Sequence, residues 1–226
     1  MSKFFSFLLI LLLICCKTEK SDDYYSDEKN ETEFIEFAFP TFDKWTECYE
    51  DRKVKSHYDE NLISNKFQNV AVYLNNETFL RKDSLGLIDY EDYAYFFINK
   101  NEQKWKLTGD DLKRIFQVQK RKNGIESYEK ESALNKVYSD TTFLHSEKPI
   151  VIEEFKSAEN IYSAVKLIKP YSDYHDIIII YVYNLMIVKN HLIYSGYYLD
   201  LNGDESIMKA KEMNGLIMSK FLGINK

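Results

Sequence analysis

The chain has 226 residues and a net charge of −6, from 30 Lys and Arg against 36 Asp and Glu. It offers no basic field for a phosphate backbone, so nucleic acid is excluded as an expected partner. What remains after the N-terminal segments described next has the length of one domain of ordinary size.

The chain begins with a short basic start and an apolar run. Lys3 precedes residues 4–14, which carry no charge, and two cysteines close the run. This order of parts is typical of a secretory signal. As a helix the apolar run would reach only about 16 Å, roughly half of a bilayer core, so a permanent membrane span is disfavoured.

The end of this run resembles the lipobox of bacterial lipoproteins, in which a Leu and a small residue precede the acylated cysteine. Here Leu13, Ile14 and Cys15 precede Cys16. The resemblance implies a signal peptide over residues 1–16, with Cys16 kept as a mature N-terminus that carries lipid such as palmitate. Cleavage before Cys15 is an alternative that would place bulky Ile14 beside the cut. A cleaved signal without lipid is the other alternative, and it leaves the double cysteine unexplained.

Residues 17–33 are predicted to be a disordered acidic tether. They hold three Lys against seven Asp and Glu and no aliphatic residue, so they cannot bury enough apolar surface to fold. An acidic stretch after the lipid cysteine also resembles the surface-export signal of some Gram-negative lipoproteins. A solvated spacer is the simpler interpretation, so the surface and periplasmic faces of the outer membrane both stay open.

Residues 34–226 are predicted to form one domain, because no Pro/Gly/Ser-rich linker interrupts them. With lipid on Cys16, only Cys48 would remain as a free thiol, so no intramolecular disulfide is expected. Residues 34–39 are a strand candidate stopped by Pro40. Thr41 can begin a helix whose apolar residues recur at three- and four-residue steps: Phe42, Trp45, Cys48 and Tyr49. Cys48 is therefore interpreted as a core residue.

Alternating patterns next predict half-buried strands, in which one set of side chains shares a face: Val70, Val72 and Leu74, then Ala94, Phe96 and Ile98. A helix is predicted from a Thr108 cap to Lys122, with Leu112, Ile115 and Phe116 buried. Asp110 and Asp111 favour its first turn, and the basic cluster of residues 120–122 favours its last. Helix termination explains this cluster better than an acidic partner does.

Strands are predicted at residues 149–155, 161–168 and 176–188, with a long hairpin that turns near residues 189–191. Residues 177–182 are unbroken β-formers, which suits a strand covered on both faces. An amphipathic C-terminal helix follows, capped by Asp204. The predicted class is α+β, an antiparallel sheet with a few packed helices. The element order of the last third resembles the PsbP-like fold, and this resemblance implies no active site.

Two polar clusters could hold a metal ion. Asp200, Asn202 and Asp204 start like a calcium loop, although Glu205 and Lys211 replace the expected Gly and Glu. An ordinary strand-to-helix turn competes with this interpretation. A second cluster, which could bind a metal or act as a general base, or could be a solvated turn, comprises Asp173, His175 and Asp176.

No complete catalytic set is present. Ser163 and Lys166 match a penicillin-recognition motif by letters only, because they fall on an alternating strand and its partner motifs are missing. The sequence thus favours a lipid-anchored cell-envelope protein, a non-catalytic module that binds a protein or small molecule at the membrane, with no cofactor. An immunity or protective lipoprotein is a special case. The alternative class is an envelope hydrolase whose Asp, Glu or His residues are assembled by the fold.

Overall fold

The computed structural model describes residues 36–60, 62, 64–82, 92–103, 105–140, 143–144, 148–169 and 177–226, and Phe37–Lys226 form one compact unit. Cys16, the predicted tether and the cluster of Asp173, His175 and Asp176 lie outside the described residues.

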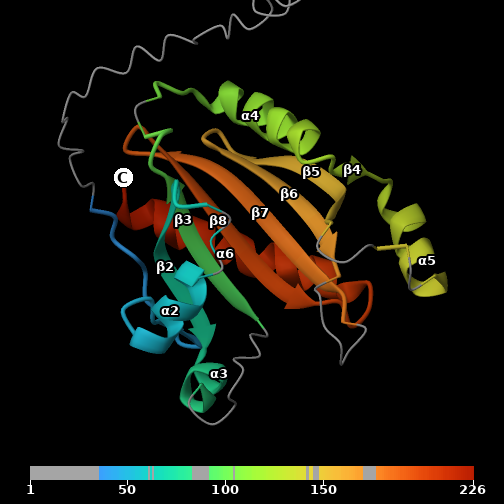
Figure 1. The fold of residues 1–226 in the computed structure, drawn as a ribbon, viewed down its shortest axis with the longest axis horizontal. Coiled ribbons are helices and arrows are strands. Elements are labelled where there is room, and N and C mark those ends of the chain that lie inside the picture. Colours follow the sequence, from blue (N-terminus) through green and yellow to red (C-terminus); the bar gives the residue numbers. More distant parts are fainter. Residues whose placement is uncertain are drawn as a thin grey trace, which may run out of the picture. The chain divides into compact units, whose positions relative to one another are not determined.

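An eight-stranded sheet runs through the described part of the chain in the order β1-β2-β3-β8-β7-β6-β5-β4 (Figure 1). Seven neighbouring pairs join these strands; β4 and β5 are parallel and the other pairs are antiparallel. Together with the helices this confirms the α+β class predicted from the sequence. The strands are β1 (Trp45–Glu47), β2 (Phe67–Asn75), β3 (Tyr93–Asn99), β4 (Glu126–Ser127), β5 (Ile150–Ala158), β6 (Ile161–Ile168), β7 (Ile179–Val188) and β8 (His191–Asp200).

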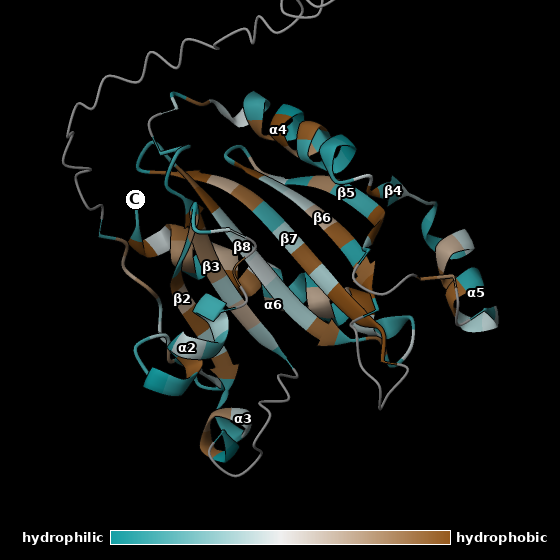
Figure 2. Cartoon of the chain, in the orientation of Figure 1, coloured by the Kyte–Doolittle hydropathy of each residue, from teal (hydrophilic) through white to brown (hydrophobic). Residues whose placement is uncertain are grey.

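Helices cover both sides of this sheet. In Figure 1, α6 lies behind the central strands and α4 runs along the upper edge of the view, above β5 and β6; the buried residues of α4 pack on the sheet face opposite α6. The apolar residues of α4 form a stripe among hydrophilic ones in Figure 2. The helices are α2 (Arg52–Glu60), α3 (Asn76–Arg81), α4 (Gly109–Lys122), α5 (Lys130–Ser139) and α6 (Glu205–Ile224).

Strand β7 shows how the sheet is buried on both faces. Ile180 and Val182 join the apolar cluster that includes α6, whereas Tyr181 and Tyr183 join the cluster that includes α4. All four side chains are buried; within the predicted run of residues 177–182, Ile180, Tyr181 and Val182 are buried, whereas residues 177–179 are only partly buried. Because neighbouring residues of a strand point to opposite faces, one strand contributes to two separate cores.

A β-bulge corrects one expectation for β2. The register against β3 shifts between Asn69 and Ala71. Val70 therefore packs in the α6-side cluster, while Val72 and Leu74 belong to the cluster around α2. A bulge inserts one extra residue and so breaks the alternation that the sequence pattern assumes.

The expected strand at residues 34–39 and the helix from Thr41 are wrong where the structure describes them. Residues 36–42 have no regular structure, and β1 occupies Trp45–Glu47. The Ala38 N–H donates to Oδ1 of Asn225 at 3.0 Å, and Nδ2 of Asn225 donates to the Ala38 carbonyl at 2.7 Å. A side chain at the end of α6 thus satisfies the backbone that a strand partner would have satisfied.

The two predicted helix caps have different outcomes. Thr108 occupies the N-cap position of α4, as expected, where its N–H and its hydroxyl each donate to Oδ2 of Asp111 at 2.9 Å; Leu112 and Phe116 are buried. Asp204 occupies the N-cap position of α6 but makes no side-chain cap hydrogen bond. Its Oδ1 instead accepts a hydrogen bond from the Tyr138 hydroxyl at 3.1 Å.

Candidate functional site

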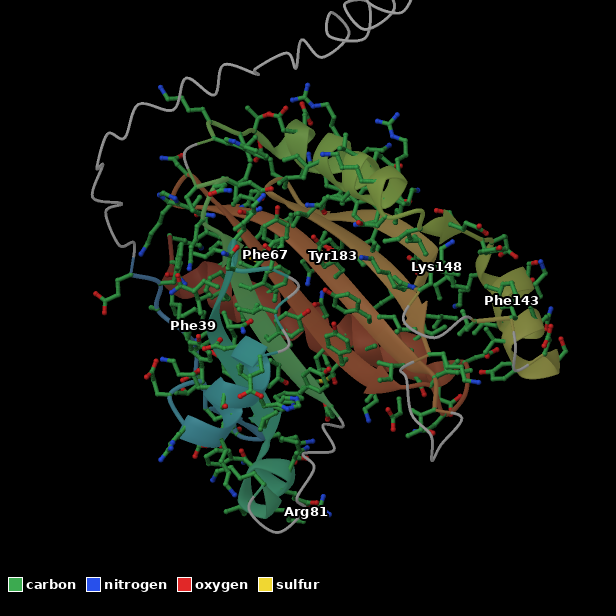
Figure 3. The ribbon with its side chains drawn as sticks, in the orientation of Figure 1. Phe39, Phe67, Arg81, Phe143, Lys148 and Tyr183 are labelled. Carbon is green, nitrogen blue, oxygen red and sulfur yellow. The ribbon has the colours of Figure 1, made fainter. Side chains whose placement is uncertain are left out.

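Tyrosines gather on the side of the sheet that carries α4. Three stacked pairs share Tyr198: its ring centroid lies 4.4 Å from that of Tyr181, 4.6 Å from that of Tyr93 and 5.6 Å from that of Tyr95. Figure 3 labels Tyr183, which lies on this side of the central strands. We call this surface the tyrosine face, and define it by Tyr93, Tyr95, Tyr162, Tyr181, Tyr183, Tyr194 and Tyr198.

A glycine in β8 makes room for this stacking. A Cβ atom added at Gly196 would overlap the Tyr181 ring and would lie 3.1 Å from Cε2 of Tyr198. Only a residue without a side chain lets the Tyr181 ring lie against the β8 backbone here. The sequence around Gly196 is therefore matched to the tyrosine on the neighbouring strand.

The hydroxyl groups of the tyrosine face are kept protonated. The Tyr95 hydroxyl lies 3.1 Å from that of Tyr198 and 3.4 Å from that of Tyr181. Burial raises the pKa of all three phenols. They therefore act as neutral donors and acceptors across the physiological pH range.

Lys166 lies among these rings, and no carboxylate of the described residues forms an ion pair with it. Its side chain points from β6 to the tyrosine face, and the residue is 6% exposed. Its Nζ lies 4.0 Å from the ring centroid of Tyr183, 5.2 Å from that of Tyr181 and 5.6 Å from that of Phe116. Burial lowers the pKa of the Lys166 amine to about 7. Near neutral pH the amine is therefore balanced between its charged and uncharged forms, and the ring faces favour the charged one.

Two carboxylates among the described residues contact the tyrosine face, and each already accepts hydrogen bonds from other side chains. Glu154 accepts hydrogen bonds from Lys120 Nζ at 2.6 Å and from the Tyr162 hydroxyl at 2.7 Å. Burial alone would raise the pKa of Glu154, but these bonds outweigh it and hold the pKa below its ordinary value. Glu102 accepts from the Tyr194 hydroxyl, and burial raises the pKa of this carboxyl.

A polar bridge links Tyr194 to Tyr183 through α4. Gln119 Nε2 donates to the Tyr194 hydroxyl at 3.2 Å, and the Tyr183 hydroxyl donates to Gln119 Oε1 at 3.0 Å. The side chain of one helix residue therefore fixes two hydroxyls of the face. The ring that lies under Lys166 is held in place by this bridge.

The calcium-loop candidates lie at the turn between β8 and α6. Asp200 ends β8, and the Asn202 N–H donates to Oγ of Ser206 at 3.1 Å. Among the residues that the structure describes, no group of three or more His, Cys, Asp or Glu is placed to hold a metal ion. With the Asp204 carboxylate bonded to a tyrosine hydroxyl, this segment has the geometry of a strand-to-helix turn.

Two further residues could in principle act as nucleophiles, Ser163 and Cys48. Ser163 lies on the opposite face of β6 from Lys166, and Cys48 is buried as a thiol. Ser163 faces α6 and donates to Asn184 Oδ1 at 2.7 Å, whereas Lys166 faces α4, so the two residues lie on opposite sides of β6. Cys48 is buried as predicted, and its thiol donates to the Val72 carbonyl at 3.4 Å. Burial raises the pKa of the Cys48 thiol to about 12, so the reactive thiolate is scarce at neutral pH.

The tyrosine face and Lys166 were missed by the interpretation of the sequence. The one signal for Lys166 is a lysine inside an otherwise uncharged strand, IYSAVKLI. Because the other residues on its face of the strand, Tyr162, Ala164 and Ile168, are uncharged, the single lysine among them needs an explanation. Its neighbours on β7 and α4 could be identified only from the fold.

Compared with models of protein families, with curated proteins and with solved structures, the chain has no match in any of the three. None of the described helices combines the length and the apolar character that crossing a membrane requires.

Proposed function

We propose that this chain is a lipid-anchored protein of the cell envelope, held in the outer membrane through Cys16, with a domain that is a non-catalytic binding module. The lipobox-like residues 13–16 and the acidic residues 17–33 support an anchor followed by a tether. The domain would then bind a partner close to the membrane surface.

The tyrosine face is the binding surface that we propose for a small molecule. The observation that carries this proposal is Lys166, a buried amine packed against aromatic rings, with no acid among the described residues paired to it. Burying a cation without a counter-ion is unfavourable for folding, and such groups are concentrated at functional sites. Tyrosine adds rigid rings with hydroxyl groups, which suit recognition of a ligand that is partly apolar.

The finer architecture supports the same proposal. We infer that β7, Lys189–Asn190 and β8 act as a long hairpin, and that α6 is the amphipathic C-terminal helix packed on its other face. Ten residues of each strand are paired, and Ile207, Ile217 and Phe221 of α6 are buried. A rigid hairpin backed by a helix would present the tyrosines in fixed positions.

The anchor is tested in cells that produce the protein, as wild type and as Cys16→Ala. The wild type should incorporate a palmitate analogue and fractionate with membranes, and Cys16→Ala should do neither. Protease treatment of intact cells then decides between the surface and the periplasmic face. Equal labelling and equal fractionation of both forms would remove the anchor from the proposal.

The binding face is tested with 2-naphthoate and its uncharged counterpart 2-naphthamide as probes. Both should bind to the wild type, and Tyr198→Leu should weaken both, since Tyr198 is part of three stacked pairs. Met208→Ala is the matched control, because Met208 is exposed on α6. If the wild type binds neither probe, or if Tyr198→Leu binds both as the wild type does, the binding face is wrongly assigned.

A further inference from the structure

Lys166 is surrounded by aromatic rings from two elements. Phe116 comes from α4, and Tyr181 and Tyr183 come from β7, with all three ring centroids within 5.6 Å of Nζ. Lys166 is paired directly with Tyr181 in the register of β6 and β7. The backbone of Lys166 is therefore fixed in the middle of the sheet, with its amine beside these rings.

The charge around Lys166 is not balanced by the protein itself. Within the described ranges, no carboxylate forms an ion pair with it. On the neighbouring β5 and α4, Glu154 and Lys120 form an ion pair at 2.6 Å and cancel one another. Glu102 is bonded to Tyr194, and burial keeps the tyrosines of β6, β7 and β8 protonated. One uncompensated positive charge is left whenever Lys166 is protonated.

We propose that Lys166 anchors the carboxylate of a small aromatic monocarboxylic acid, whose flat apolar body packs against the tyrosine face. This inference rests on the proposed binding function and names the ligand class for it. A single unpaired cation matches a single negative charge, because Lys120 is already paired with Glu154. A phosphate dianion would need further cations or a cluster of free donors, which the described part of this face does not supply.

An aromatic body fits the side chains beside the amine. Tyr95, Phe97 and Tyr198 are partly exposed on the same face, and Tyr198 stacks on Tyr181, which lies next to Lys166. A ligand that lies along these rings would exchange water for aromatic contacts while its carboxylate meets the amine. Binding would bring in the counter-ion that the protein lacks.

Proton uptake is the distinctive consequence of this arrangement. At pH 8 the Lys166 amine is mostly uncharged, because its pKa is about 7. A bound carboxylate favours the charged form and raises this pKa. Binding of 2-naphthoate at pH 8 should therefore take up about one proton from the buffer, whereas 2-naphthamide should take up none.

The experiment is isothermal titration calorimetry of 2-naphthoate and 2-naphthamide at pH 8, in two buffers with different ionisation enthalpies. Lys166→Met should weaken 2-naphthoate about tenfold or more and change 2-naphthamide by less than about twofold. Lys166→Arg should keep the preference for the anion but lose the proton uptake, because a guanidinium does not titrate in this range. Thermal unfolding of both variants checks that they are folded.

The outcomes separate the two proposals. If the wild type binds neither probe, the binding face itself is wrong, and the ligand class is overturned with it. If the wild type binds both probes equally without proton uptake, the face binds ligands but Lys166 does not anchor a carboxylate. Tighter binding of 2-naphthoate with proton uptake, lost in Lys166→Met, is the result that we expect.

Discussion

On the α6 side of the sheet four buried polar side chains satisfy one another, whereas on the tyrosine face one buried cation has no acid partner among the described residues. Asn184 of β7 donates to Asn214 of α6 at 2.7 Å and receives a hydrogen bond from it at 3.1 Å. Ser163 donates to the same Asn184, and Asn184 donates to Ser195 at 2.9 Å. All four residues are at most 3% exposed.

This difference separates a structural role from a functional one. A closed polar network fixes how α6 docks on the sheet, because every buried group has a partner only in that arrangement. An unpaired buried amine has only the surrounding ring faces to offset the cost of its burial. Strand β6 carries both kinds of group, Ser163 on one face and Lys166 on the other. The difference in hydrogen-bond pairing therefore depends on what packs against each face of the sheet.

Breaking the network on the α6 side should have the largest effect. Asn184→Leu removes the shared partner of Ser163, Ser195 and Asn214, and it should lower the free energy of unfolding by about 3 kcal/mol. Urea denaturation measures this loss. The matched control is the double variant Asn184→Leu/Asn214→Leu, which no longer buries an orphaned amide and should lose less than the sum of the single variants. Strictly additive losses would contradict a cooperative network.

Removing the cation from the tyrosine face should raise the free energy of unfolding, whereas breaking the polar network lowers it. Lys166→Met should unfold less readily than the wild type at pH 6, because the wild type buries a charge there. The folded pKa of about 7 lies below the ordinary value of 10.5. As pH rises above 7, the folded state loses its proton while the unfolded state keeps it, so the wild type gains stability.

The advantage of Lys166→Met should therefore shrink by roughly 2.7 kcal/mol between pH 6 and pH 9. Urea denaturation of both proteins at the two pH values measures the change. Restricting the comparison to pH 9 and below keeps the titration of the tyrosines out of it. A stability difference that does not depend on pH would mean that Lys166 is not held as a desolvated amine.

Local patterns predicted the elements whose signals are local. The alternation in residues 67–75 and 93–99 and the marked ends of α4 correspond to β2, β3 and α4. The helix predicted from Thr41 was wrong because the pairing of β1 with Tyr73–Asn75, a distant segment of the chain, favours a strand there. Helix α5 was missed because its N-cap is Glu129, whose side chain accepts from two backbone N–H groups, and Glu is not among the preferred caps.

The candidate site was beyond local patterns for the same reason. The strand that contains Lys166 was predicted, but the absence of an acid beside this residue depends on Glu154 being paired with Lys120 of α4. The role of Gly196 depends on Tyr181, fifteen positions earlier in the chain. Both facts belong to contacts between elements, and the sequence pattern of a single element does not contain them.

Adding a side chain at Gly196 on the tyrosine face should lower the free energy of unfolding by less than breaking the polar network does. Gly196→Ala pushes the Tyr181 ring away from Tyr198 and should lower the free energy of unfolding by about 1–2 kcal/mol, as overpacking does. Near-UV circular dichroism should lose part of its tyrosine signal. Gly215→Ala is the matched control in α6, where a Cβ meets nothing within 4 Å, and it should gain roughly 0.5–1 kcal/mol.

The smallest expected change in stability comes from replacing either of two adjacent glutamates, Glu154 on the tyrosine face and Glu153 on the α6 side. Glu154→Gln replaces a carboxylate that three donors reach and should cost about 1 kcal/mol at pH 7. Since the folded pKa of Glu154 is lowered, this contribution is present above its ordinary value of 4.5 and is lost as pH falls through the folded pKa. Glu153→Gln breaks a pair with Lys211 whose side chains are about one-third exposed, and it should cost only a few tenths of a kcal/mol. Urea denaturation at pH 7 and pH 3 tests both, and equal costs at pH 7 would show that the Glu154 cluster does not hold α4 on the tyrosine face.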